Sequence, residues 1–222
     1  MTHFLQLGGG KSSPQKGSMR SNKIRGFTLI EMMIALSISF VISAFAIMSI
    51  QGALKDARVT TAYNQTLMTL RNTRQLAVDD RKTYFVTFAL PQTMQVWRQD
   101  QGSPALPPPV LLNTYQLPFD VKFDTEPGIP TTATTTPDGF GTALSPLDFD
   151  QGSGGGGTTI YFKPDGGAYD LAGNVNNGVV YMAHPGDLYS SRAITLYGLS
   201  GRMRGWRLYK NTASGTSQWQ PN

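Results

Sequence analysis

An apolar run from Phe27 to Ile50 constrains the fold of this chain more than any other feature of its sequence, and Glu31 is the only charged residue within it. As a helix, these 24 residues would be about 36 Å long, enough to cross a hydrocarbon layer of roughly 30 Å. A carboxylate inside such a layer costs several kcal/mol unless a partner neutralises it. The sequence therefore predicts a transmembrane helix over residues 27–50 and a partner for Glu31.

The charges on the two sides of this run are unequal. The chain has a formal net charge of +5, and the five basic residues of segment 1–26, which has no acidic residue, account for it. Lys55, Asp56 and Arg58 follow the run and nearly balance one another. Because positively charged flanks are retained in the cytoplasm, we expect residues 1–26 inside and the C-terminal part outside.

Gly26 lies between the basic segment and the apolar run, whereas a secretory signal has its small-residue cleavage site after the run. A plain signal anchor is the alternative interpretation. The sequence GFTLIE, residues 26–31, closely resembles the class III signal of type IV prepilins and pseudopilins. In that family a prepilin peptidase cuts after the glycine and methylates the new N-terminus. The resemblance therefore implies removal of leader 1–26, cleavage between Gly26 and Phe27, and N-methylation of Phe27.

The same resemblance implies a role for Glu31 in assembly. It matches the carboxylate thought to pair with the free N-terminal amine of a neighbouring subunit in the fibre. Each buried charge then gains a partner only after assembly, so its burial favours docking in the correct register. The implied partners are prepilin peptidase, other pilin or pseudopilin subunits, and the bacterial inner membrane. The implied location is a single-pass inner-membrane protein with a periplasmic C-terminal domain, and after assembly a pilus or pseudopilus.

Beyond the run, apolar and small residues recur at three- and four-residue spacing and predict an amphipathic continuation of the helix over residues 51–80. The stripe consists of Val59, Ala62, Tyr63, Thr66, Leu67, Leu70 and Ala77. A helix that ends near Val78 is long for a globular protein but suits a pilin whose second half packs on a sheet. A separate soluble helix after a break near Gln51–Gly52 is the alternative.

Residues 81–222 contain short runs with strand-like alternation, which predict a β-rich domain. Thr83–Leu90 and Thr93–Gln99 are expected to form a hairpin around Pro91-Gln92. The other predicted strands are 119–124, 158–164, 178–184, 192–198 and 205–210. The expected fold is therefore α+β and pilin-like, with a long N-terminal helix packed on an antiparallel sheet.

Two motifs in the C-terminal part narrow the resemblance. FKPDG at residues 162–166 and the later GRMR at residues 201–204 resemble the signature of the GspH/FimT group. This group covers the H-type minor pseudopilin of type II secretion and the FimT- and FimU-like minor type IV pilins. The resemblance covers residues 25–80 and 158–210, whereas residues 100–157 match no such pattern. It implies a minor structural subunit of a type II secretion pseudopilus or of a type IV pilus.

The C-terminal segment 192–222 has five basic residues and no acidic one, whereas segment 100–187 has ten acidic residues and two lysines. In FimT-like pilins a Gly-Arg-x-Arg element is associated with DNA capture, and it matches Gly201 to Arg204 here. Arginines can pair with phosphates, and exposed aromatic rings can stack on unpaired bases. The candidate DNA-binding residues are Arg202, Arg204, Arg207 and Lys210, with Trp206 and Tyr209 nearby. The alternative is that the arginines balance the acidic segment or protect a sheet edge.

Few residues could support catalysis or bind a metal. The chain has no cysteine and only two histidines, so neither a His-rich zinc site nor a Cys–His pair can be built. His184, before a Pro-Gly pair, is expected in a turn or at a strand end. Asp148 and Asp150 resemble the opening of a calcium loop, but Thr159 stands where the closing glutamate is required. We therefore expect no enzymatic activity, no cofactor and no metal.

Overall fold

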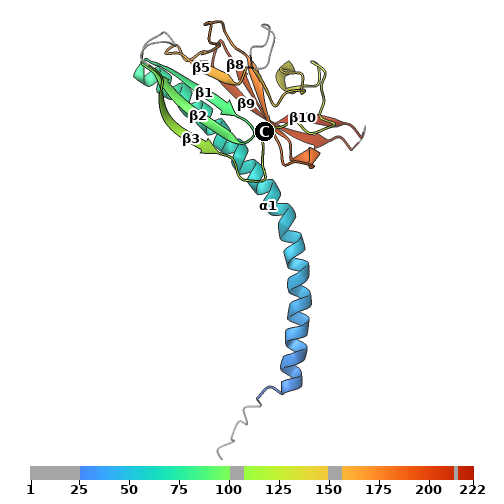
Figure 1. The fold of residues 1–222 in the computed structure, drawn as a ribbon. Coiled ribbons are helices and arrows are strands. Elements are labelled where there is room, and N and C mark those ends of the chain that lie inside the picture. The colour runs from blue at the N-terminus through green and yellow to red at the C-terminus, as the bar shows by residue number, and fades with distance from the viewer. Residues whose placement is uncertain (1–25, 101–107, 150–156, 213–214) are drawn as a thin grey trace, which may run out of the picture. The chain divides into compact units, whose positions relative to one another are not determined.

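The computed structural model describes residues 26–100, 108–149, 157–212 and 215–222. By internal contacts the chain divides into two compact units, Met1–Ala46 and Ile47–Asn222. The one α-helix of the described residues, α1 (Leu29–Asp80), begins in the first unit and ends in the second (Figure 1). Gln51 and Gly52 both lie within this helix, so the prediction of an uninterrupted helix is confirmed and the predicted alternative of a break is wrong.

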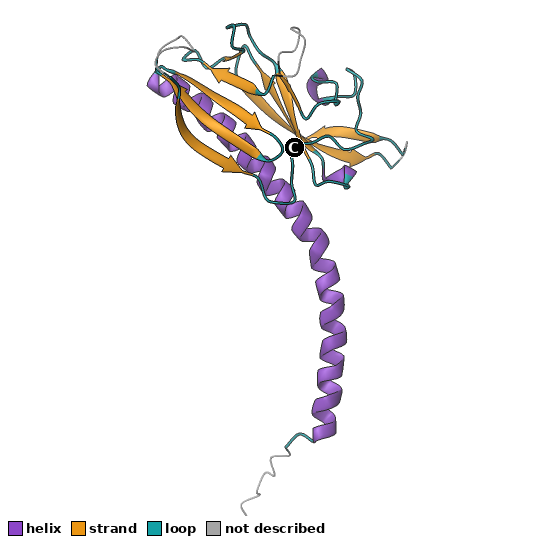
Figure 2. Ribbon diagram, viewed as in Figure 1, coloured by secondary structure: helices purple, strands orange, loops and turns teal. Residues whose placement is uncertain are grey.

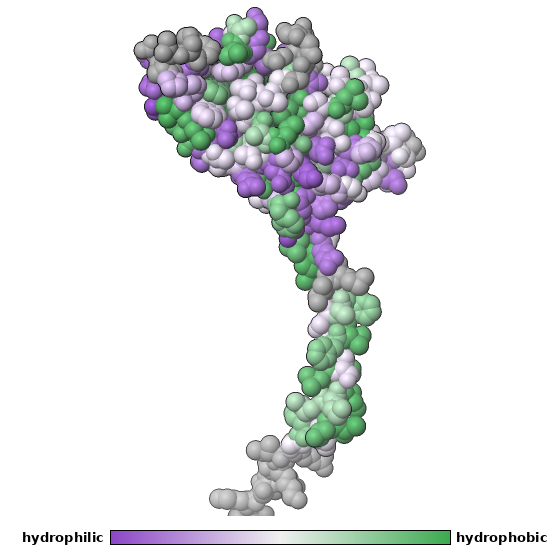
Figure 3. Space-filling view, viewed as in Figure 1, coloured by the Kyte–Doolittle hydropathy of each residue, from purple (hydrophilic) through white to green (hydrophobic). Residues whose placement is uncertain are grey.

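The part of α1 in the first unit has an exposed, apolar surface. All its side chains from Leu29 to Phe45 are exposed, and most of that surface is hydrophobic (Figure 3). Ser37, Ser39 and Ser43 each donate a hydrogen bond of 2.7–2.8 Å to the carbonyl oxygen four residues earlier. Their hydroxyl groups are therefore satisfied within the helix, as a hydrocarbon environment requires. α1 is also the one helix in the described part of the chain that is long and apolar enough to cross a membrane.

The second unit contains the end of α1 and two antiparallel five-stranded sheets, with strand orders β3-β2-β1-β5-β6 and β10-β9-β8-β7-β4 (Figure 2). We call these the first and the second sheet. The strands of the first sheet are β1 (Thr83–Ala89), β2 (Thr93–Gln99), β3 (Val110–Gln116), β5 (Thr159–Phe162) and β6 (Ala168–Tyr169). Those of the second are β4 (Leu147–Phe149), β7 (Gly178–Met182), β8 (Arg192–Tyr197), β9 (Arg202–Lys210) and β10 (Ser217–Pro221). Two short 3-10 helices, η1 (Pro137–Gly139) and η2 (Leu188–Ser190), lie in the connections.

The main hydrophobic core is formed by α1 together with both sheets. All seven residues of the predicted helical stripe are buried. Six of them lie within one cluster that also contains Val86 and Ile160 of the first sheet and Ile194 and Leu196 of the second. The periodicity of residues 59–77 therefore predicted the face of α1 that packs on the sheets. The prediction of an α+β fold is confirmed.

The second sheet is buried on both faces, which explains the apolar runs of its central strands. Along β7, Val180 and Met182 belong to the main core, whereas Val179 and Tyr181 belong to a second cluster on the opposite face. That second cluster also contains Ile129 and Ala143 from the segment between β3 and β4, and Ala193, Leu208 and Trp219 from β8, β9 and β10. Part of the region that resembled no known pattern therefore covers the second face of this sheet.

Several strand predictions are confirmed and one is wrong. The hairpin corresponds to β1 and β2, and four other predicted runs correspond to β5, β7, β8 and β9. Residues 119–124 do not form a strand, since Lys122 makes only an isolated bridge with Ala183. Val121 and Phe123 are nevertheless buried in the main core, so their alternation with polar residues reflects packing of an irregular segment. Strands β3, β4, β6 and β10 were not predicted from the sequence.

The end of α1 is held against the first strand. Arg81 follows the helix in a left-handed conformation (φ 54°) and reverses the chain into β1. The hydroxyl of Tyr84 donates a hydrogen bond to the Asp80 carboxylate. Burial of Tyr84, together with the hydrogen bond and negative charge of Asp80, raises the pKa of Tyr84 to about 12.

Candidate functional site

The residues predicted for processing lie in a short non-helical stretch before α1. Gly26 and Phe27 are exposed there. The next residue, Thr28, accepts a hydrogen bond of 3.2 Å at Oγ1 from the backbone N–H of Glu31. Thr28 is thus the N-cap of α1 and Glu31 occupies the acidic position of a Thr-x-x-Glu capping box. The sequence prediction missed this local role of Glu31, although the four-residue pattern shows it.

The capping interaction uses the backbone of Glu31 and leaves its carboxylate available. The Glu31 side chain is exposed, and its carboxylate has no ion pair within the described ranges. A negative charge in the first turn is favoured by the helix dipole, but only by about 0.3–1 kcal/mol. That gain is smaller than the several kcal/mol that a charge costs in hydrocarbon. Helix capping alone therefore does not offset the cost of this charge.

The two motifs that resemble the GspH/FimT signature meet at Arg74 of α1. Arg74 donates from Nε to the carbonyl oxygen of Gly166 (2.8 Å) and from Nη2 to that of Ser200 (3.1 Å). Gly166 ends the FKPDG turn between β5 and β6, and Ser200 precedes the GRMR motif in the turn between β8 and β9. A turn of each sheet is therefore bound to the same helical side chain.

The glycine of the GRMR motif has a structural role at this junction. Gly201 has a φ of 60°, in the left-handed region. A Cβ atom at Gly201 would collide with the carbonyl oxygen of Gly166 and with the Arg74 side chain. Packing of the two turns against α1 therefore requires glycine at this position, whether or not the following arginines contact a ligand.

β9 carries all four candidate DNA-binding residues, but strand geometry separates them. Successive side chains of a strand point to opposite faces, and β9 pairs with β8 without a register shift. Arg202, Arg204 and Lys210 therefore share one face of the second sheet, and Arg207 lies on the other. Arg202 and Lys210 are exposed, whereas Arg204 and Arg207 are only partly exposed. The four residues consequently do not form one continuous basic surface.

Arg204 is paired with a buried carboxylate, that of Asp138 in η1. Its Nη1 lies 3.0 Å from Asp138 Oδ1, and its guanidinium lies 4.6 Å from the centre of the Trp206 ring. Asp138 also accepts hydrogen bonds from Thr195 Oγ1 and from Trp206 Nε1 (3.2 Å), and its side chain is only 5% exposed. The charge of Arg204 is thus largely used to neutralise Asp138, which the sequence analysis had included only in the acidic segment 100–187.

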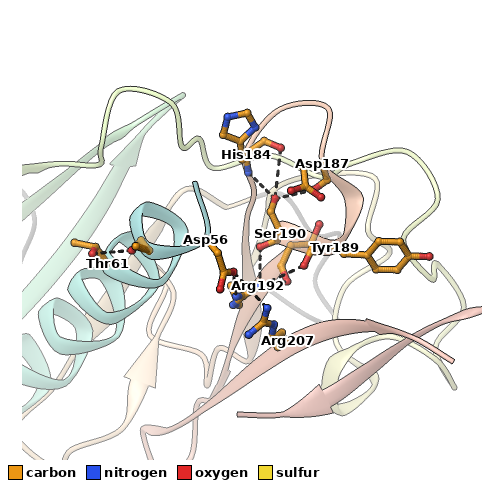
Figure 4. Close-up of polar contacts among 10 residues, drawn as sticks. Asp56, Thr61, His184, Asp187, Tyr189, Ser190, Arg192 and Arg207 are labelled. Atoms are coloured by element: carbon orange, nitrogen blue, oxygen red, sulfur yellow. Dashed lines mark hydrogen bonds and ion pairs between the residues drawn. The ribbon is translucent and has the colours of Figure 1, made fainter. Parts of the chain in front are cut away.

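Arg207 takes part in a second charged cluster, around Asp56 of α1 (Figure 4). Asp56 Oδ1 accepts from Arg192 Nη2 at 2.8 Å and from Arg207 Nη2 at 3.3 Å. Arg192 begins β8 and is only 2% exposed. Its Nη1 also donates to the carbonyl oxygens of Tyr189, Ser190 and Ser191, at 3.5, 2.9 and 3.3 Å. We call Asp56, Arg192 and Arg207 the Asp56 cluster.

The electrostatics of the Asp56 cluster depend on its one acid. Burial and the neighbouring positive charge of Arg207 lower the pKa of Arg192, and Asp56 opposes both effects. Two arginines therefore share one half-exposed carboxylate, and their positive charges repel each other. Asp56 and Arg192 are 136 residues apart, and their contact was not predicted from the sequence.

The structure places two of the residues considered for catalysis or metal binding, His184 and Asp148. His184 follows β7 at the start of a turn, as predicted, and its Nε2 lies 3.9 Å from Asp120, which is already bound by Arg58 at 2.7 Å. Asp148 is buried and accepts a hydrogen bond from the Thr142 N–H, and Asp150 lies outside the described residues. No group of three or more His, Cys, Asp or Glu residues that could bind a metal ion occurs in those ranges.

Comparison with known proteins identifies the N-terminal part of the chain. The family model described as "Prokaryotic N-terminal methylation motif" matches residues 21–47. This span includes Gly26, Phe27 and Glu31 and the first third of α1. No curated protein and no solved structure matches the chain. The match covers less than an eighth of the sequence, and it ends before the first strand of either sheet.

Proposed function

We propose that this type IV pilin-like protein is a minor pseudopilin of the GspH/FimT group, a structural subunit of a type II secretion pseudopilus or of a type IV pilus. The observation that carries the proposal is the methylation motif over residues 21–47, at the start of a helix that ends against two antiparallel sheets. The motif implies processing by a prepilin peptidase and assembly with other pilins. The contacts of the FKPDG and GRMR turns with Arg74 support the narrower assignment.

In this proposal the peptidase cuts between Gly26 and Phe27 and methylates Phe27. The exposure of both residues ahead of the helix supports access by a protease, because a peptide bond within a regular helix is a poorer substrate. The single hydrophobic N-terminal helix is consistent with an inner-membrane-anchored prepilin that has a soluble C-terminal domain. We further propose that this domain lies in the periplasm, because the basic leader is retained in the cytoplasm.

Glu31 is proposed to pair with the free N-terminal amine of a neighbouring subunit. Its exposed carboxylate and the insufficient gain from helix capping support an external partner. The pairing would make assembly favourable only in a register that brings the amine and the carboxylate together. Phe27 and Glu31 then act as the two complementary ends of one contact, and the chain has no enzymatic role.

Processing can be tested by co-expressing the full chain with a prepilin peptidase. Mass spectrometry is expected to find an N-terminus at Phe27 with an added methyl group. A Gly26→Val chain should remain uncut, because the branched side chain obstructs the cleavage site, whereas Gly17→Val within the same leader should be cut normally. An intact wild-type precursor, or a cut beyond Ile50, would remove the basis of the proposal.

The pairing of Glu31 can be tested separately from helix capping. Glu31→Gln retains a residue suited to the capping box but removes the charge. Membrane insertion should be unchanged or improved, since a cost in hydrocarbon is removed. Incorporation into filaments, measured by immunoblotting of sheared or purified fibres, should fall. Wild-type incorporation of the Gln variant would show that the charge is not used for assembly.

DNA binding in the manner of FimT-like pilins is the second candidate function. Its support is the exposure of Arg202 and Lys210 on one face of β9. The ion pairs of Arg204 with Asp138 and of Arg207 with Asp56 weaken it, because Arg204 is neutralised by a buried carboxylate and Arg207 shares the Asp56 carboxylate with Arg192. The structural role is therefore the proposal that the geometry supports better.

A further inference from the structure

The second unit begins to cover α1 close to the end of its apolar run. Residues 50–57 of the helix are all exposed, whereas Val59 is fully buried. All of these residues belong to the second unit. A helix rises 1.5 Å per residue, so Val59 lies about 14 Å beyond Ile50 along the axis. The side chains that contact α1 at residues 55–58 thus lie at the end of the second unit that is nearest to the apolar run.

This end of the second unit is positively charged. The Asp56 cluster has two arginines and one carboxylate (Figure 4). Arg58, two residues further along α1, pairs with Asp120 at 2.7 Å, and Lys55 is exposed on the same turn of the helix. We call the Asp56 cluster, Lys55, Arg58, Phe119 and Asp120 the basic rim. Its four basic and two acidic residues give it a net charge of +2.

An exposed aromatic ring lies beside these charges. Phe119 is 77% exposed, and the Arg58 guanidinium lies 4.9 Å from the centre of its ring. The segment that carries Phe119 is anchored, because Leu117 and Val121 on either side of it are buried in the main core. The ring is therefore held in water at the rim, although its burial would be favourable. Basic side chains together with an exposed apolar ring are typical of surfaces that bind the interface of a bilayer.

We propose that the basic rim docks on the anionic phospholipid headgroups of the membrane that α1 crosses, before the subunit is assembled. Docking of this kind requires the membrane insertion of α1 that the proposed function assumes. The polar layer on each side of a bilayer is about 5–8 Å thick, and Asp56 lies about 9 Å beyond Ile50 along the helix. The charges of the rim are therefore within one Debye length, about 8 Å, of the lipid phosphates. A lipid phosphate would supply the second negative charge that the two arginines of the Asp56 cluster lack.

Single fluorescent labels can test this docking on the full chain, because it has no cysteine of its own. Phe119→Cys, modified with the environment-sensitive nitrobenzoxadiazole group, places an aromatic label where the phenylalanine ring was. Leu199→Cys is the matched control, since Leu199 is 81% exposed and precedes Ser200, whose carbonyl oxygen is bound by Arg74. Arg74 lies about 24 Å further along α1 than Arg58. The chain is placed at one copy per lipid nanodisc of phosphatidylcholine, with or without phosphatidylglycerol.

We expect the label at position 119 to brighten and shift to the blue when phosphatidylglycerol is present, and to revert in high salt. The label at position 199 should not change. In the Phe119→Cys background, Lys55→Gln should lower the ratio of docked to undocked chains about five-fold, the contribution of one basic residue near an anionic surface. Arg71→Gln removes the same charge from an exposed residue about 24 Å further along α1, and it should leave that ratio unchanged.

The same emission from position 119 in both lipid compositions, or parallel changes at positions 119 and 199, would overturn the proposal. Equal effects of the Lys55 and Arg71 variants would also overturn it. A response that requires two chains in one nanodisc would assign the rim to a second copy of the chain instead of to lipid.

A third label separates failure of the docking from failure of the proposed function. Ile38 lies within the apolar part of α1, so a label at Ile38→Cys should be buried in lipid in both compositions. An Ile38 label exposed to water would contradict the membrane insertion on which the proposed function depends. A buried Ile38 label together with an unresponsive label at position 119 would contradict the docking alone.

Discussion

Replacing Asp56 by asparagine tests whether the Asp56 cluster stabilises the second unit. The substitution keeps the shape of the side chain and one acceptor oxygen but removes the negative charge that pairs with Arg192 and Arg207. Arg192 would then keep its three carbonyl partners, and the two arginines would repel each other without compensation. The substitution should destabilise the second unit, because Arg192 is buried and water cannot solvate its charge once the carboxylate is removed.

The magnitude follows from the geometry. Removing one partner of a fully buried ion pair costs about 3–5 kcal/mol. The Asp56 side chain is 50% exposed, so water screens part of this interaction, and asparagine can still accept a hydrogen bond. We expect a loss of about 2 kcal/mol in the free energy of unfolding. For a unit of this size that corresponds to a fall in Tm of about 4–8 °C.

Thermal unfolding of the full chain in nanodiscs, followed by near-ultraviolet circular dichroism, would measure this loss. Asp79→Asn is the control, since Asp79 is an exposed acid on the same helix that accepts a hydrogen bond of 2.8 Å from the Gln75 amide, and the Tm of this variant should change little. Adding Arg207→Gln to Asp56→Asn should raise Tm again, because it removes the charge that repels Arg192. Equal Tm values for the Asp56 and Asp79 variants, or a further fall in the double variant, would refute the reasoning.

Three further substitutions test other parts of the structure. Gly205→Ala should destabilise the second unit by about 1–3 kcal/mol in urea unfolding, because its Cβ would collide with the Tyr63 hydroxyl where β9 approaches α1; wild-type stability would contradict this close approach. Tyr84 has a raised pKa in the folded state, so its contribution to stability is present below pH 10 and is lost between about pH 10 and pH 12. Tyr84→Phe should therefore be the less stable protein at neutral pH, through loss of the bond to Asp80, and the difference should narrow at alkaline pH; a constant difference would contradict the shift. Arg202→Gln should abolish most of any salt-sensitive DNA binding in a filter or fluorescence assay, and unchanged binding would exclude the GRMR element as its site.

The membrane-spanning helix and the candidate processing site at Gly26 could be predicted from the sequence. Hydropathy, helix length and the position of Gly26 before the apolar run are local properties, and their meaning does not depend on where the rest of the chain folds. The stripe from Val59 to Ala77 was equally readable, because a period near 3.6 residues marks one face of a helix regardless of what it packs against. The capping role of Thr28 was also readable but was missed.

Two segments of the β-rich region show where local patterns stop being informative. Val121 and Phe123 alternate with polar residues as a strand would, yet they belong to an irregular segment whose apolar side chains enter the main core. β3 was missed for the opposite reason, since its side chains are mostly exposed and show no buried alternation. Strand pairing depends on partners far along the chain, so neither error could be corrected by inspecting the segment itself.

The sequence by itself determined that this chain has a prepilin-like N-terminus, one long helix whose second half has one buried face, and a β-rich remainder. Only the tertiary structure decided what the charged residues of β9 do. Arg204 meets an aspartate 66 residues away, and Arg207 meets one 151 residues away. An ion pair is formed by proximity in space, and proximity between distant residues is a property of the folded chain that charge counting along the sequence cannot supply.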